Sequence, residues 1–134
     1  MLKLTKDELL YMNAFQAFTG VMARDCVIID DTIAFVVKEE EVGKAIGKNG
    51  QTVKNLSIRT KKKIQIFPYC KESEAFIRQV FRENTLETVT VENKEMTVTA
   101  SNADKKKILQ NKWKFSIVKE IAKRNYEIEK IKIK

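Results

Sequence analysis

The chain has 134 residues, which is enough for one ordinary domain or for two small ones of about 65 residues each. It carries 26 lysines and arginines against 18 acidic residues and no histidine, for a net charge of +8. The lack of histidine excludes cysteine–histidine zinc sites and histidine-based catalytic triads. No apolar run reaches the roughly 18 residues of a membrane span, and charged residues come too early for a signal peptide. We therefore expect a cytoplasmic protein without membrane contacts.

The positive charge is segregated along the chain. Residues 42–71 hold eight lysines and arginines and no acid, and residues 103–134 hold eleven against four acids. Clustered lysines favour polyanions, because binding releases the counterions condensed on phosphates. A solvated lysine-rich surface has the same composition, so charge alone leaves both interpretations open.

The first half of the chain predicts a helix, a β-hairpin, two helices and a third strand. Thr5 and Glu8 have capping-box spacing, and Gly20 is a typical C-terminal stop. Apolar periodicity and β-rich runs then give strands at 26–29 and 32–37, helices at 39–46 and 51–60, and a strand from 63 that ends at Pro68.

The second half repeats this order. The predicted elements are a helix at 73–82, strands at 86–91 and 96–100, helices at 104–110 and 114–124, and a strand at 127–133. Matching Phe35 to Val98 gives an offset of 63, and matching Ile66 to Ile131 gives 65. These offsets indicate an internal duplication whose second copy is about two residues longer. We expect an α+β fold of two modules, 1–70 and 71–134, each a three-stranded sheet packed with helices.

Three of the four glycines lie within the segment VGKAIGKNGQTVKNL, at Gly43, Gly47 and Gly50. A tight turn between two helices needs dihedrals that glycine adopts without a Cβ clash, but one glycine would supply them. A second is useful if a ligand must approach the backbone, and the amides that begin the next helix suit a phosphate. Lys48 adds charge at the tip. The spacing fits neither a P-loop nor a dinucleotide-binding fingerprint.

With Ile46 before the first glycine, and with two strands before the helix pair and one after it, this segment closely resembles the signature of type II (prokaryotic) KH domains. KH domains clamp about four nucleotides of single-stranded RNA with a GXXG loop. The resemblance implies that the loop residues clamp the RNA backbone. Ile46 and Val53 would line an apolar groove or belong to the core, and the Lys61–Lys62 run would extend the phosphate track or be a solvated turn. The RNA-binding residues expected in the first module are Ile46, Gly47, Lys48, Asn49, Gly50, Val53, Lys54, Lys61 and Lys62.

Two such modules in tandem resemble the KH portion of the NusA family of transcription factors, in its short archaeal form, over essentially the whole chain. The resemblance implies single-stranded RNA binding in transcription termination or elongation, with the RNA polymerase elongation complex as a further partner. The second module departs from the pattern, because its corresponding segment, 109–115, reads LQNKWKF and has no GXXG. Lys112 and Lys114 would still meet phosphate and Trp113 would stack on a base, or Trp113 and Phe115 would pack between the modules.

No nucleophile, general base or metal set can be assembled from the sequence, so we expect no enzyme activity, cofactor, metal or small-molecule substrate. The alternative function is a protein-interaction adaptor that docks a KH-like scaffold on RNA polymerase or the ribosome. Cys26 and Cys70 have no CxxC spacing. Either they form a disulfide with each other or they are buried free thiols, and we expect the free thiols in a reducing compartment.

Overall fold

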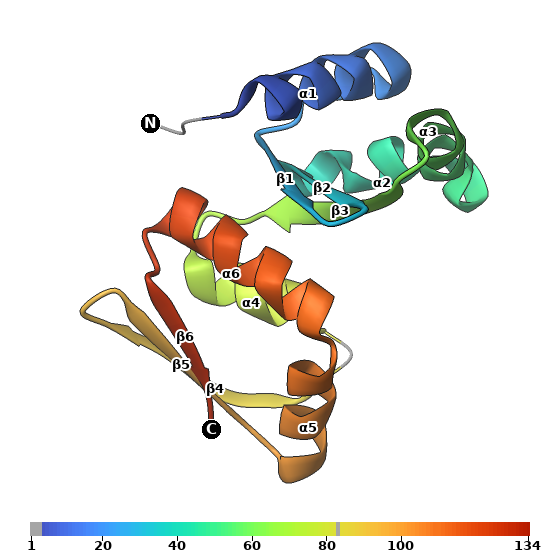
Figure 1. Ribbon diagram of the computed structural model, residues 1–134. Coiled ribbons are helices and arrows are strands. Elements are labelled where there is room, and N and C mark those ends of the chain that lie inside the picture. The colour runs from blue at the N-terminus through green and yellow to red at the C-terminus, as the bar shows by residue number, and fades with distance from the viewer. Residues whose placement is uncertain (1–3, 83) are drawn as a thin grey trace. The chain divides into compact units, whose positions relative to one another are not determined.

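A computed structural model describes residues 4–82 and 84–134 (Figure 1). Contacts within the chain divide it into two compact units, of which the first ends at Tyr69 and the second begins at Cys70. Each unit holds a three-stranded sheet and helices. The predicted α+β class, with two sheets packed with helices, is confirmed.

The first unit begins with the predicted capped helix. The Thr5 N–H donates to Glu8 Oε1 at 2.8 Å, the Glu8 N–H donates to Thr5 Oγ1 at 3.1 Å, and Gly20 ends the helix at φ 75°. The elements in order are α1 (Lys6–Thr19), β1 (Asp25–Ile29), β2 (Thr32–Lys38), the 3-10 turn η1 (Glu39–Glu41), α2 (Val42–Ile46), the 3-10 turn η2 (Lys48–Gly50), α3 (Gln51–Thr60) and β3 (Lys63–Tyr69).

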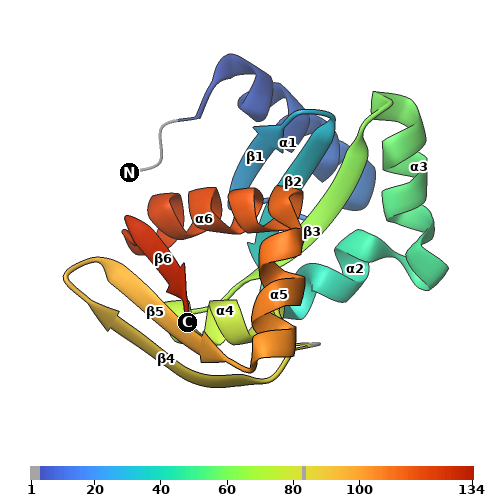
Figure 2. The same cartoon turned by 60° about the horizontal axis from the view of Figure 1, so that its bottom comes forward.

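The strand order of the first sheet is β1-β2-β3, with β1 antiparallel and β3 parallel to β2 (Figure 2). A parallel pair needs a crossover connection, which α2 and α3 provide, so the glycine cluster lies inside that crossover. The predicted end of β3 at Pro68 is wrong, because Pro68 pairs with Val37 and the strand continues to Tyr69. An edge strand tolerates proline, since its outer side has no ladder partner that needs an N–H.

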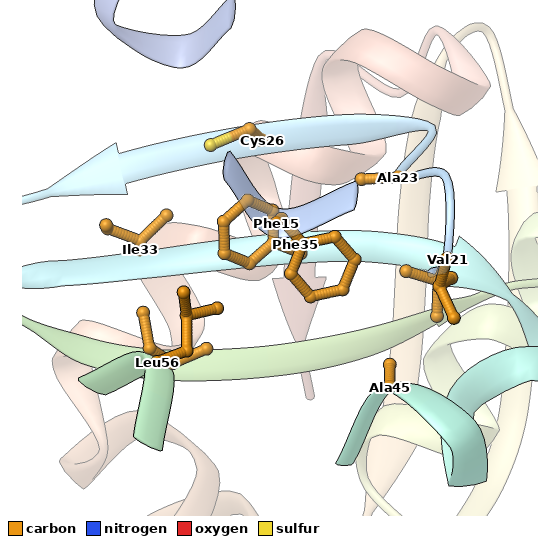
Figure 3. Close-up of a cluster of buried hydrophobic side chains, with 10 residues drawn as sticks. Phe15, Val21, Ala23, Cys26, Ile33, Phe35, Ala45 and Leu56 are labelled. Carbon is orange, nitrogen blue, oxygen red and sulfur yellow. The ribbon is translucent and has the colours of Figure 1, made fainter. Parts of the chain in front are cut away.

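An aromatic stack fixes α1 on the sheet (Figure 3). The Phe15 ring of α1 lies 4.2 Å from the Phe35 ring of β2, with 18° between their planes, and both side chains are buried. Ala45 of α2 and Leu56 of α3 are buried in the same cluster. One core therefore positions all three helices and, with them, the turn between α2 and α3.

The second unit has the same order of elements. They are α4 (Ser73–Val80), β4 (Leu86–Glu92), β5 (Glu95–Ala100), α5 (Asn102–Gln110), α6 (Lys112–Tyr126) and β6 (Lys130–Ile133). The sheet order is β4-β5-β6, again antiparallel and then parallel. Asn93 and Lys94 join β4 to β5 at φ 52° and 63°, so the predicted hairpin turn is confirmed.

The strand registers correct the proposed length of the repeat. Phe35 pairs with Ile66, and Val98 pairs with Ile133. The offset between copies is therefore 63 for the hairpins and 67 for the third strands, so the second crossover is four residues longer rather than two. The sequence match of Ile66 with Ile131 was wrong by two positions. The extra length appears in α6, which has 15 residues where α3 has 10.

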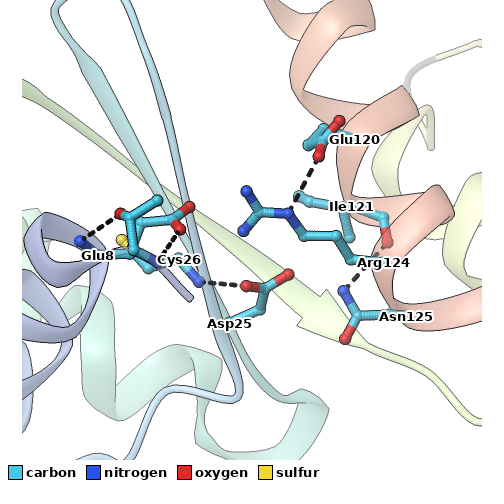
Figure 4. A network of polar contacts seen from close by, with 8 residues as sticks. Glu8, Asp25, Cys26, Glu120, Ile121, Arg124 and Asn125 are labelled. Carbon is cyan, nitrogen blue, oxygen red and sulfur yellow. Dashed lines mark hydrogen bonds and ion pairs between the residues drawn. The ribbon is translucent and has the colours of Figure 1, made fainter. Parts of the chain in front are cut away.

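Side-chain polar contacts are present in each unit (Figure 4). In the first, the Asp25 carboxylate accepts from the Cys26 N–H at 2.8 Å. In the second, Arg124 Nε lies 3.1 Å from Glu120 Oε1. The Tyr126 hydroxyl donates to the Cys70 carbonyl at 2.7 Å and accepts from the Cys70 N–H at 3.1 Å. Both cysteines are buried free thiols, as expected.

Truncating the aromatic stack tests this account of the first core. We expect Phe15→Ala to lower the free energy of unfolding by about 3–5 kcal/mol, because it removes a fully buried ring. Leu10→Ala on the same helix, where Leu10 is 57% exposed, should change it by less than about 0.5 kcal/mol. Urea denaturation followed by circular dichroism measures both, and equal effects would contradict the proposed role of the stack.

A second prediction concerns the β5–β6 pair. Glu95 Oε1 lies 2.9 Å from Lys132 Nζ, and this hydrogen bond lowers the pKa of Glu95, with the charges of Lys132, Lys130 and Lys134 adding to it. Because the folded-state pKa lies below the unfolded-state one, the stabilisation is present above the unfolded-state pKa and is lost as the pH falls through the folded-state value. Lys132→Gln should raise the pKa of Glu95 toward its usual range, as measured by NMR titration of its carboxyl. Lys123→Gln, at an exposed position of α6, should leave it unchanged.

Candidate nucleic-acid interface

The turn between α2 and α3 is built from left-handed backbone. Gly47 has φ 82° and ψ 169°, Asn49 has φ 56° and ψ 29°, and Gly50 has φ 72° and ψ 13°. The Gly47 N–H donates to the Gly43 carbonyl at 3.0 Å, which ends α2, and the Gly50 N–H donates to the Gly47 carbonyl at 3.1 Å. Three of the four residues of the GKNG loop thus adopt dihedrals that oppose a β-carbon, and asparagine is one of the few residues with a side chain that accepts them.

The glycines of this segment are needed for different reasons. A Cβ on Gly47 would collide with the Thr52 side chain and would lie 2.8 Å from the Thr52 backbone nitrogen. A Cβ on Gly50 would meet open space, so glycine is needed at this position only for its positive φ. Gly43 has neither constraint. The close approach of the Gly47 backbone to α3 explains why one glycine would not suffice.

The tip of the loop is open to solvent. Lys48 and Asn49 are exposed, and Gly47 and Gly50 are partly exposed. Gly50 is the N-cap of α3, and no side chain caps that end of the helix. The loop therefore presents main chain, one ammonium group and the positive end of a helix dipole in one place, which is the combination that binds phosphate.

The two apolar residues expected beside the loop differ in environment. Ile46, the last residue of α2, is 36% exposed. Val53 is partly buried and packs against the core cluster of the first unit, so its structural role is visible in the fold. Ile58 of α3 is 66% exposed and was missed by the sequence interpretation. The sequence feature that could have identified Ile58 is an isoleucine on an otherwise polar helix face, four positions after Lys54 and four before Lys62.

The lysines of α3 and its C-terminus do not all gather at the loop. Lys54 is exposed on the first half of α3, close in sequence to the loop. Lys61 is exposed and Lys62 partly exposed just beyond the last residue of the helix, roughly 15 Å from its start at 1.5 Å per residue. They lie one helix length from Gly50 and would contact a different part of any bound chain.

The second unit replaces the loop with helix. Asn111 alone joins α5 to α6. The left-handed caps that end α3 and α6 are Lys61 and Glu127, an offset of 66, so residues 112–115 occupy the positions of 46–49. There they form the first turn of α6 rather than a left-handed loop. Lys112 is exposed, Trp113 is 44% exposed, and Lys114 is partly exposed with its Nζ 5.2 Å from the centre of the Phe81 ring.

Within residues 4–82 and 84–134, no three histidine, cysteine or acidic side chains come together as metal ligands would. Over the same residues, no helix is both long and apolar enough to cross a bilayer.

Comparison with known proteins identifies the family. A family model described as "KH domain" matches residues 10–99, which include the crossover and its glycine loop and more than half of the chain. The chain belongs to the KH domain family. The predicted membership of the KH family is thereby confirmed.

The curated relatives are archaeal proteins named "Probable transcription termination protein NusA". One from Methanocaldococcus jannaschii is 37% identical over 98 residues, covering 73% of this chain and 54% of the relative. Another, from Methanococcus vannielii, is 37% identical over 90 residues, covering 67% and 52%. This chain thus spans about half the length of these two relatives. Among solved structures, the crystal structure of APE1850 has a TM-score of 0.85 at 26% identity and covers 98% of this chain and 100% of that one.

The loop geometry predicts which glycines the fold requires. We expect Gly47→Ala to destabilise the protein by about 1–3 kcal/mol, because alanine is strained at φ 82° and its Cβ would collide with Thr52. A Thr52→Ala background should recover only part of this loss, since the backbone nitrogen of residue 52 remains in contact. Gly43→Ala, in open space on α2, should be neutral or stabilising by up to about 1 kcal/mol. Thermal unfolding of the three variants measures the difference, and a neutral Gly47→Ala would contradict the geometry.

Proposed function

We propose that this protein binds single-stranded RNA through the Gly47–Gly50 loop, without catalysing a reaction, and acts in transcription termination or elongation. The observation that supports this most is the loop itself. Two glycines and Asn49 hold its backbone at positive φ, and Lys48 and Asn49 are exposed at its tip. In KH domains a GXXG loop clamps the backbone of about four nucleotides.

The physical basis of the clamp is close approach. Phosphate oxygens reach the main chain where glycine leaves no side chain in the way, and the α3 dipole and the Lys48 ammonium favour their negative charge. Ile46, exposed at the end of α2, offers an apolar surface for a base beside the loop. Lys54 would contact the next phosphate, and Lys61 and Lys62 would contact one further along the chain.

The transcriptional role is supported by the curated relatives, whose names place them in transcription termination. The proposed partners are therefore nascent single-stranded RNA and the RNA polymerase elongation complex. We propose neither a cofactor nor a small-molecule substrate.

A charge reversal at the tip of the loop tests the clamp. The double variant Lys48→Asp/Asn49→Asp should fold normally, because both positions are exposed and aspartate tolerates left-handed dihedrals. We expect its affinity for short single-stranded RNA to fall by at least about tenfold, a loss of about 1.4 kcal/mol, through repulsion of phosphate. Fluorescence anisotropy of labelled RNA at several salt concentrations measures it.

The hairpin of the second unit offers a matched control. Asn93 and Lys94 are the same two residue types in reverse order and are also exposed, and Asn93 has positive φ as Asn49 does. Asn93→Asp/Lys94→Asp makes the same charge change at the exposed tip of a tight turn and should leave RNA affinity within about twofold of the parent. Equal losses of RNA affinity in the two variants would show that binding depends on the overall charge of the protein and not on the loop. Intact binding by the loop variant would favour the adaptor function, which a polymerase pull-down that survives nuclease treatment would then support.

A further inference from the structure

The side chain of Asn49 has chemistry that the proposed function does not use. Asn49 is exposed at the tip of the loop, and its side-chain amide forms no hydrogen bond with any residue that the structure describes. Gly50 follows it, and no other asparagine of the chain precedes a glycine. Asparagine is a thermolabile residue, and a following glycine favours its deamidation because no side chain obstructs the attacking nitrogen.

The reaction needs only the loop and water. The Gly50 nitrogen loses its proton, bonds to the Asn49 side-chain carbonyl carbon and expels ammonia, which leaves a cyclic imide. Water then opens the imide at one of its two carbonyl carbons. One product is an aspartyl residue. The other is an isoaspartyl residue, in which the main chain runs through the former side chain.

The surroundings of the Gly50 nitrogen favour its deprotonation. Gly50 is the N-cap of α3, and no side chain caps that end of the helix. The positive end of the helix dipole therefore lies beside the nitrogen and stabilises negative charge there. Lys48 adds an exposed ammonium group, and residues 42–71 contain no acid. A Cβ on Gly50 would meet open space, so nothing crowds the reacting atoms.

One hydrogen bond opposes the reaction. The Gly50 N–H donates to the Gly47 carbonyl at 3.1 Å, and this bond must break before the nitrogen can attack. Asn49 must also leave its ψ of 29° so that the imide ring can close. Both changes are confined to an exposed turn, so we expect brief opening of the loop to limit the rate.

The hairpin turn of the second unit provides an internal comparison. Asn93 and Lys94 are exposed and have φ 52° and 63°, close to the 56° and 72° of Asn49 and Gly50. In both turns an asparagine and its successor adopt positive φ. The attacking nitrogen belongs to lysine in one turn and to glycine in the other, so only the first unit combines an exposed turn with an unobstructed attack.

We propose that Asn49 is a site of spontaneous deamidation and that its conversion switches off phosphate binding by the loop. The aspartyl product places a carboxylate next to Lys48 and offsets its positive charge. The isoaspartyl product adds one carbon to the main chain before Gly50, which moves the Gly50 N–H away from the Gly47 carbonyl. The chemistry is independent of RNA, whereas the loss of binding rests on the proposed function.

Peptide mapping of the full chain tests the site. We would incubate the protein at several pH values above neutrality and follow its tryptic peptides by mass spectrometry, with a zero-time sample to correct for conversion during digestion. Cleavage after Lys48 and Lys54 releases residues 49–54. We expect this peptide to gain the mass difference between OH and NH₂, at a rate that rises with pH because the Gly50 nitrogen must lose a proton. Asn93 should stay unchanged.

Two substitutions exchange the following residue between the turns. Gly50→Ala keeps Asn49 and puts a Cβ into open space, and it should make conversion too slow to detect in the time that converts half of the parent. Lys94→Gly should make Asn93 reactive. An unchanged peptide 49–54 in the parent, or equal conversion in the parent and Gly50→Ala, would overturn the site.

RNA binding tests the switch separately. The converted protein is less basic and can be isolated by ion exchange. We expect it to bind short single-stranded RNA several-fold more weakly than the parent, with a salt slope lower by about one. If the converted protein binds fully while Lys48→Asp/Asn49→Asp does not, the switch is overturned and the clamp stands. If both bind fully, the loop is not the clamp, and the switch falls with the proposed function.

Discussion

The parallel pairing of β3 with β2 is the constraint on which the first unit depends. A strand that must run beside its predecessor in the same direction has to be reached by a crossover, and here 24 residues separate Lys38 from Lys63. Two helices fit into that length only if the chain turns sharply between them. This turn needs backbone at positive φ, which glycine adopts most easily, and glycine leaves the main chain accessible to solvent. The backbone that forms the candidate RNA clamp is therefore required by the crossover that completes the sheet.

The second unit keeps the parallel pairing but has a longer crossover. Its sheet has the same order and directions, but its crossover is four residues longer. The additional length lets α6 begin directly after Asn111, and the positions of the loop become helix. No glycine is then required, and none is present between β5 and β6. Two copies of one topology therefore offer different surfaces: exposed main chain in the first, and helix side chains such as that of Trp113 in the second.

The sequence predicted most of the fold because its local signals were strong. The capping box at Thr5 and Glu8, the stop at Gly20 and the turn at Asn93–Lys94 each have a local physical cause, and each appears in the structure. The errors occurred where pairing partners decide the outcome. Pro68 continues a strand because that strand lies at the edge of its sheet. The alternating pattern of residues 127–133 predicted a strand from residue 127, but Glu127 is the left-handed cap of α6 and the strand begins only at Lys130.

The glycine loop was predictable from the sequence only in part. The spacing of Gly47 and Gly50 pointed to the loop, since two glycines so close together between helices indicate a turn whose backbone stays accessible. That Gly47 also makes room for Thr52 depends on contacts that no spacing reveals.

The hydroxyl of Tyr126 has a consequence for the order in which the protein is completed on the ribosome. It bonds both backbone groups of Cys70, the first residue of the second unit, from the last residue of α6, 56 positions away. The start of this unit is therefore secured only after residue 126 has been synthesised. The first unit contains its sheet, its helices and its glycine loop within residues up to Tyr69. Because folding during synthesis proceeds from the N-terminus, the candidate RNA-binding loop would be assembled while the second unit is still an open chain.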